Sequence, residues 1–154
     1  MSDEGLRALL HDVADRVATF RAGLADRPAG AEASGDALVA GFDGPLPESP
    51  TDPGKVVDEL VRAAEPGLTA TPGPRFFGFV IGGSLPAALA ADWLTSGWDQ
   101  NAGVQVASPA AAAAEEGARR WLVDLLGLPA AASVGFVTGG QMAKVTFGLG
   151  GGEV

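Results

Sequence analysis

The sequence predicts a mainly helical chain with one or two short strands. Apolar residues recur at intervals of three and four along several stretches, which is the period of a helix with one buried face. Ser or Asp followed by Pro opens some of these stretches, a pattern typical of helix starts. Hydrophobic residues make up 47% of the 154 residues, but 23 are Gly and 11 are Pro, and much of the apolar content is Ala. We therefore expect a core with few large side chains.

The first predicted helix covers about 3–27 and is followed by a Pro/Gly-rich linker at 28–52. Pro28 ends the helix, and the linker has room for one short helical turn at about 36–40. The apolar stripe of the helix is formed by Leu6, Leu9, Leu10, Val13, Val17, Phe20 and Leu24.

A second amphipathic helix is predicted after Asp52, which is placed to cap it, with Pro53 at its first position and an end near Glu65. Its apolar face is formed by Val56, Val57, Leu60, Val61 and Ala64. The faces of both helices need partners. They can pack on each other as a hairpin or on another chain.

A strand is expected at 75–81, because this stretch is apolar and aromatic and lies between glycines. It can belong to the core or line a cleft. The next helix should be capped by Ser84, start at Pro86 and run to Trp98. It has little polar face, so we expect it to be buried, with Asp92 pointing outward or paired.

Asp99, Gln100 and Asn101 follow as a polar cluster that can cap a helix end or face a cleft. Ser108 and Pro109 then start an alanine-rich helix that Gly127 ends. On this helix the spacing predicts exposed ion pairs at i,i+4, namely Glu115 with Arg119 and Glu116 with Arg120.

The stretch from Val134 to Met142 predicts a strand, a tight turn at Gly139 and Gly140, and the start of a helix. Such a turn exposes backbone N–H groups at the positive end of a helix dipole, which favours an anion such as phosphate. An ordinary turn is the alternative interpretation. Complete signatures of a serine hydrolase, a nucleotide-binding P-loop or a dinucleotide fingerprint are not found.

Composition and charge exclude several classes of function. The 19 acidic and 10 basic residues give a net charge of -9, which opposes binding to nucleic acid. The chain has no Cys and one His, His11, so disulfides and zinc-thiolate or multi-histidine metal sites are excluded. His11 is expected at the surface. Neither a secretory signal nor a run of membrane-spanning length is visible, so we expect a cytoplasmic protein without nucleic-acid or membrane partners.

Several motifs together resemble the group II pyridoxal-phosphate-dependent amino-acid decarboxylases, which include the aromatic-amino-acid and glutamate enzymes. The resemblance covers roughly 38–143 and is carried by the segments 74–86, 98–103, 108–111 and 134–142. It implies that the chain is part of an α/β architecture of the fold type I transferases. It also implies pyridoxal 5′-phosphate as cofactor, an amino acid as substrate and a homodimer in which the N-terminal helices wrap around the partner.

The resemblance assigns residues to two sites and none to catalysis. Gly139, Gly140, Gln141 and Met142 match the family's phosphate-binding turn. Phe79, Val80, Ile81 and Gly82 match positions that line the substrate cleft. The stacking histidine, the carboxylate partner and the Schiff-base lysine of the family are expected downstream of Val154. Lys144 stands where relatives usually have asparagine, on the same turn as the phosphate contacts. The chain alone is therefore expected to bind the cofactor weakly or not at all and to release no carbon dioxide from amino acids.

Three regions follow from this comparison. They are an N-terminal helical dimerisation segment at 1–70, the start of the cofactor-binding large domain at 71–143, and an aberrant glycine-rich tail at 144–154. The apolar faces that would meet the missing domain and the partner subunit should be exposed, which favours aggregation. The alternative function is a non-enzymatic helical interaction or dimerisation protein.

Because the sequence changes abruptly to glycine-rich at the phosphate turn, we hypothesise a truncated or frame-shifted reading frame whose native sequence stops at about Ala143. Translation of the DNA downstream of codon 143 in all three frames should show a continuation with a histidine, an aspartate and a His-Lys pair. Absence of this continuation from every frame would remove the hypothesis.

Overall fold

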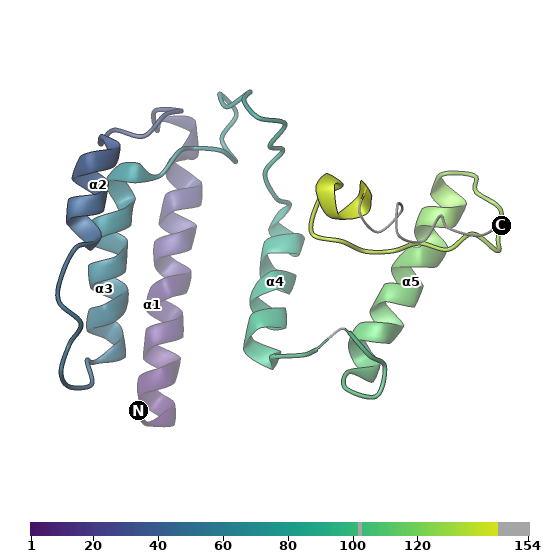
Figure 1. Cartoon of the computed structure of the whole chain (residues 1–154), viewed down its shortest axis with the longest axis horizontal. Coiled ribbons are helices and arrows are strands. Elements are labelled where there is room, and N and C mark those ends of the chain that lie inside the picture. Colours follow the sequence, from purple (N-terminus) through teal and green to yellow (C-terminus); the bar gives the residue numbers. More distant parts are fainter. Residues whose placement is uncertain (102, 145–154) are drawn as a thin grey trace. The chain divides into compact units, whose positions relative to one another are not determined.

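The computed structural model describes residues 1–101 and 103–144 and divides the chain into two compact units, Met1–Pro86 and Ala87–Val154 (Figure 1). Among the described residues, the regular structure consists of helices, with no strand, and turns and irregular segments connect them. None of the helices found there is both long enough and apolar enough to cross a bilayer.

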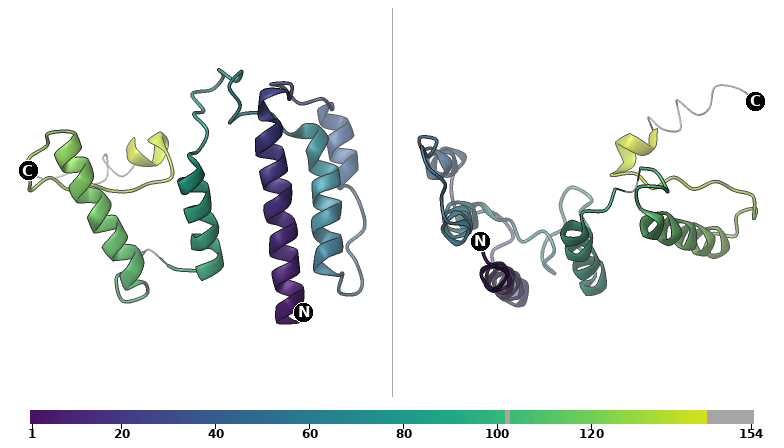
Figure 2. Two further views of the ribbon diagram at one scale, coloured as in Figure 1. Left: turned by 180° about the vertical axis from the view of Figure 1, so that it is seen from behind. Right: turned by 90° about the horizontal axis from the view of Figure 1, so that it is seen from below.

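The first unit is a group of three helices with two short 3-10 turns. α1 (Asp3–Ala22) continues into η1 (Gly23–Ala25), α2 (Gly35–Phe42) lies in the former linker, and α3 (Pro53–Ala64) continues into η2 (Glu65–Gly67). The three α-helices lie side by side (Figures 1 and 2). Both predicted amphipathic helices are confirmed.

Side-chain caps set where these three helices begin. The Ser2 hydroxyl accepts a hydrogen bond from the Gly5 N–H at 3.1 Å, and the Ser34 hydroxyl accepts from Ala37 at 3.3 Å. The Asp52 carboxylate accepts from the Lys55 N–H at 3.1 Å. Each cap gives an acceptor to a first-turn N–H that has no carbonyl partner within its own helix. The predicted cap at Asp52 is confirmed.

Two kinds of contact join the helices of this unit. α2 packs closely on α3, where a Cβ added at Gly41 would lie 3.8 Å from Ala63. α1 and α3 are joined by Arg16, whose guanidinium pairs with Asp12 on its own helix at 2.7 Å and with Asp58 on α3. Small residues thus allow α2 to lie close to α3, and an ion pair connects α1 to α3.

Burial is slight in the first unit. Leu24 and Ala70 are its buried apolar residues among those described, whereas Leu10 and Leu60 are 56% and 55% exposed. The expected shortage of core and the expected exposed apolar faces are both confirmed. An apolar surface of this kind is normally covered by another part of a protein or by a partner.

The second unit contains α4 (Pro86–Trp98), α5 (Pro109–Leu125) and a helix that begins at 140. The predicted bounds of α4 are correct, but the expectation that it is buried is wrong. No residue of α4 is buried, and Trp98 is 64% exposed. α4 is apolar around most of its surface, and it makes no extended contact with α5. Asp92 is exposed, as expected.

The polar cluster after α4 caps helix ends. The Gln100 side-chain amide donates to the Trp98 carbonyl at 2.8 Å, and its oxygen accepts from the Ser108 hydroxyl at 3.0 Å. Ser108, which is 1% exposed, accepts from the Ala111 N–H and so caps α5. Gln100 therefore links the end of α4 to the start of α5, and the capping interpretation is confirmed.

α5 ends in a Schellman motif. Gly127 has a φ of 63°, and the Leu128 N–H donates to the Val123 carbonyl at 2.9 Å. On the surface of α5, Arg119 pairs with Glu116, three residues before it, at 2.7 Å, and the predicted pair with Glu115 is not formed. The predicted pair of Glu116 with Arg120 is present at 3.8 Å.

The two expected strands are absent from the described residues, which corrects the predicted fold. Residues 70–81 form β-turns instead. Each turn is closed by a backbone N–H that donates to the carbonyl three residues earlier, and the donors are Gly73, Phe76 and Ile81. Residues 134–137 belong to no helix and no strand. A strand is stabilised by a neighbouring strand, and the described residues supply none. The glycine-rich part of the tail at 145–154 lies outside the described residues.

The end of α5 allows a test of the structure with two glycines. Gly127→Ala should lower the free energy of unfolding by about 1 kcal/mol, because a side chain is strained at its positive φ. Gly117→Ala should raise it by up to about 1 kcal/mol, because Gly117 lies inside α5 and an added Cβ meets no described atom within 4 Å. Urea unfolding followed by circular dichroism measures both. Equal effects of the two substitutions would contradict the helix end described here.

Candidate functional site

The two predicted groups of site residues lie in different units. Phe79 to Gly82 belong to the first unit, and Gly139 to Met142 belong to the second. Within each group the residues lie together because they are neighbours in sequence.

A helix begins immediately after Gly139. The Ala143 N–H donates to the Gly139 carbonyl at 3.0 Å, which is the first hydrogen bond of this helix. The N–H groups of Gly140, Gln141 and Met142 precede that donor, so no carbonyl of the helix can accept from them. All three residues are exposed. The turn and the helix start agree with the prediction, although the strand before them does not form.

This helix start differs from those of α1, α2, α3 and α5. Each of these helices begins after a Ser or Asp whose side chain accepts from a first-turn N–H. Gly139 occupies the corresponding position before the helix that begins at residue 140, and it has no side chain that could accept a hydrogen bond. The first-turn donors there are thus available to an external acceptor, and the helix dipole favours a negatively charged one.

The local fold does not require glycine at these two positions. A Cβ added at Gly139 or Gly140 meets no described atom within 4 Å, and neither residue has the positive φ seen at Gly127. The missing side chains are therefore not explained by the turn itself. They leave room for a bulky anion such as phosphate to approach the backbone.

The predicted cleft residues form a strained β-turn rather than a strand. The Ile81 N–H donates to the Gly78 carbonyl at 3.3 Å, which places Phe79 and Val80 at the centre of the turn. Their φ angles are 57° and 58°, a conformation that a β-branched residue such as valine rarely adopts. Their side chains are 90% and 105% exposed, so they point into solvent in this chain.

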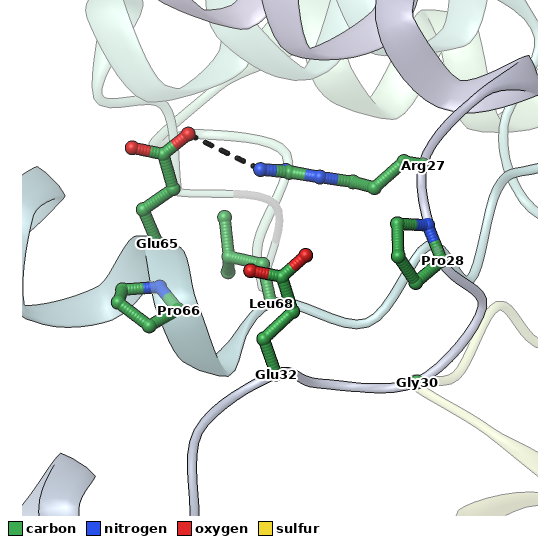
Figure 3. Close-up of a pocket in the computed structure, with 7 residues that line it drawn as sticks. All are labelled: Arg27, Pro28, Gly30, Glu32, Glu65, Pro66 and Leu68. Carbon is green, nitrogen blue, oxygen red and sulfur yellow. Dashed lines mark hydrogen bonds and ion pairs between the residues drawn. The ribbon is translucent and has the colours of Figure 1, made fainter.

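A pocket that the sequence did not indicate lies in the first unit after the end of α1 (Figure 3). The cavity has a volume of about 230 Å³ and is lined by Arg27, Pro28, Gly30, Glu32, Glu65, Pro66 and Leu68. Arg27 donates to Glu65 at 3.1 Å and lies 4.8 Å from the ring centre of Phe20. Because Arg27 and Glu65 are far apart in sequence, no periodicity could have predicted their pairing. The ion pair supports the fold at the end of α1.

The groups with shifted pKa values form ion pairs on α1, α3 and α5, and none of them is a candidate-site residue. The pKa of Arg16 is raised because it donates a hydrogen bond to Asp12, with a further contribution from Asp58. The pKa of Glu116 is lowered because Arg119 donates to it, and the pKa of Arg119 is raised for the same reason. No group of three possible metal ligands occurs among the described residues, and His11 is exposed as expected.

The strained turn gives a direct test. Val80→Gly should raise the free energy of unfolding by about 1 kcal/mol, because glycine adopts a positive φ without steric cost. Ile81 follows these two residues and does not have a positive φ. Ile81→Gly should therefore lower the free energy of unfolding. Urea unfolding of the two variants measures the difference. A destabilising Val80→Gly would show that the turn is not strained at this position.

Comparison with known proteins identifies a relative. No protein-family model matches the chain. An aromatic-L-amino-acid decarboxylase of Bacillus atrophaeus is 29% identical to the chain over 146 residues, which cover 95% of this chain and 30% of that protein. The chain thus spans less than a third of the relative's length. The resemblance expected from the sequence is confirmed at this level: the chain is a distant homologue of aromatic-L-amino-acid decarboxylase over a part of that enzyme.

Proposed function

We propose that the chain corresponds to the N-terminal portion of a pyridoxal-phosphate-dependent amino-acid decarboxylase and contributes the seat for the cofactor's phosphate. The observation that carries the proposal is the helix start at Gly139, where first-turn N–H groups lack the side-chain cap present at α1, α2, α3 and α5. The distant homology to a decarboxylase supports the class of enzyme.

The residues at this helix start fit a phosphate group. The N–H groups of Gly140, Gln141 and Met142 would donate to its oxygens, and the Gln141 side-chain amide offers a further donor. Hydrogen bonds to a charged acceptor contribute about 1.5–3 kcal/mol each, before the cost of ordering both partners. With few such bonds and an exposed site, we expect a dissociation constant on the order of 1 mM for this chain alone.

The chemistry of decarboxylation would come from the cofactor, whose ring accepts electrons when the carboxylate of an amino acid leaves as carbon dioxide. This chain would hold and orient the phosphate. Its two lysines, Lys55 and Lys144, are assigned no chemical step. Lys55 lies on α3 and pairs with Glu59 at 3.8 Å, and Lys144 follows the proposed phosphate donors on the same short helix.

The strained turn is proposed to supply shape to the substrate cleft of the whole enzyme. Phe79, Val80, Ile81 and Gly82 carry no ionisable group, so their contribution would be apolar contact with the substrate. Their high exposure in this chain supports a role against a surface that the chain itself does not provide. The exposed faces of α1 and α3 likewise support the proposed homodimer.

A second candidate function is a non-enzymatic helical interaction protein. The exposed apolar faces of α1, α3 and α4 favour it, because they suit a protein partner without any cofactor. The two candidates differ at the helix start near 140. Only the decarboxylase proposal needs a phosphate to bind there.

The proposal predicts that Gly140→Ala weakens phosphate binding without loss of helix. The added methyl group would occupy the space that the phosphate needs, so the affinity should fall about tenfold, equivalent to about 1.4 kcal/mol. Helix content should not fall, because alanine favours a helix over glycine by about 1 kcal/mol. Saturation-transfer NMR with pyridoxine 5′-phosphate measures the affinity. This compound has no aldehyde and therefore cannot react with lysines.

Two controls accompany this experiment. Gly135→Ala, whose added Cβ also meets no described atom within 4 Å, should leave the affinity unchanged. Pyridoxine without its phosphate should bind neither variant nor the unmodified chain. Equal affinity of the Gly140→Ala and Gly135→Ala variants, or no saturation transfer to pyridoxine 5′-phosphate at all, would contradict the proposal and favour the interaction protein.

A further inference from the structure

The segment 72–84, called the aromatic loop here, begins and ends at the same place in the first unit. A Cβ added at Gly83 would lie 3.2 Å from the Cα of Pro72, so the two ends of the loop touch. Between them, Phe77 and Phe79 are 92% and 90% exposed. A closed loop whose tip is apolar and exposed is held mainly from its base.

The incoming end of the loop is fixed by Arg75. Its guanidinium donates to the Arg27 carbonyl at 2.6 Å. Arg27 is itself held by Glu65 at 3.1 Å and by Phe20. Just before the loop, the Ala70 N–H donates to the Ala29 carbonyl at 3.2 Å. This end is therefore attached to the chain that follows α1.

The outgoing end of the loop is fixed by Arg21, which lies in the last turn of α1. Its guanidinium donates to the Ser84 carbonyl at 3.0 Å. The donor and acceptor are far apart in sequence, so this bond is a long-range constraint on the loop. Arg21 and Arg75 thus attach opposite ends of the loop to the end of α1 and the residues after it.

The conformation of the tip supports a role for these attachments. Phe79 and Val80 both have positive φ angles, and such strained residues persist when the surrounding structure restricts the alternatives. Their side chains are exposed, so side-chain packing does not restrict them. The hydrogen bonds that can restrict the backbone are the one from the Ile81 N–H to the Gly78 carbonyl within the turn and those of Arg21 and Arg75 at the base of the loop.

We propose that Arg21 and Arg75 are positioning residues that clasp the aromatic loop at its base and so set the direction in which Phe79 and Val80 point. What the tip contacts rests on the proposed function, in which these residues shape the substrate cleft. The clasp itself is a property of the first unit. It can therefore be tested without any ligand.

The test is the backbone order parameter of the loop, measured by nitrogen-15 relaxation on the full chain and on Arg21→Met and Arg75→Met variants. In the unmodified chain the amides of residues 77–82 should have order parameters near those of rigid backbone, about 0.85. Each variant should lower them to below about 0.6, while the amides of α1 and α3 stay unchanged. Arg21→Lys, which keeps a cationic donor, should restore part of the order.

Arg7→Met is the matched control, because Arg7 is an exposed arginine on the same helix. It should leave the loop as ordered as in the unmodified chain. Unchanged loop order in both Arg21→Met and Arg75→Met would overturn the clasp, and so would low loop order in the unmodified chain. A loss of order that includes α1 and α3 equally would also overturn it, because the arginines would then be general supports of the unit. None of these outcomes depends on pyridoxine 5′-phosphate binding, so the clasp and the proposed function can fail separately.

Discussion

The first N–H groups of a helix need acceptors from outside the helix, and this requirement explains much of the local structure of the chain. Ser2, Ser34, Asp52 and Ser108 each supply a side-chain oxygen at a helix start. Gly139 supplies none, although the same kind of helix begins after it. The expected cap of α4 by Ser84 is not found among the described hydrogen bonds, so the contrast holds for α1, α2, α3 and α5. The proposed phosphate site depends on this difference, because an anion can accept at the last helix as a side chain does at those four.

Few described residues of this chain are buried, whereas hydrogen bonds close most of its helix starts and several of its turns. Among the described residues, Leu24, Ala70, Val123 and Ser108 are buried, and most large apolar side chains lie at the surface. Local hydrogen bonds and a few arginine contacts therefore define the described structure. The chain spans 30% of its decarboxylase homologue, and the proposed function has the rest of such an enzyme cover this apolar surface.

The sequence predicts helices and their ends well here, because Ser or Asp caps, Pro at first positions and Gly127 act within a few residues. It does not predict what covers a helix: the composition of α4 alone predicts burial, whereas no residue of α4 is buried. Nor does it predict the turn at Phe79 and Val80, because both residue types favour strands when a neighbouring strand is present. The contacts of Arg21, Arg27 and Arg75 join distant parts of the sequence and leave no periodic signal.

The most direct measurement is an amide-resolved NMR titration of the chain with pyridoxine 5′-phosphate. The account predicts that the largest shifts occur at the N–H groups of Gly140, Gln141 and Met142, and that the first-turn amides of α3, where Asp52 already accepts, stay in place. Shifts confined to the arginines of the first unit, with none at residues 140–142, would contradict it.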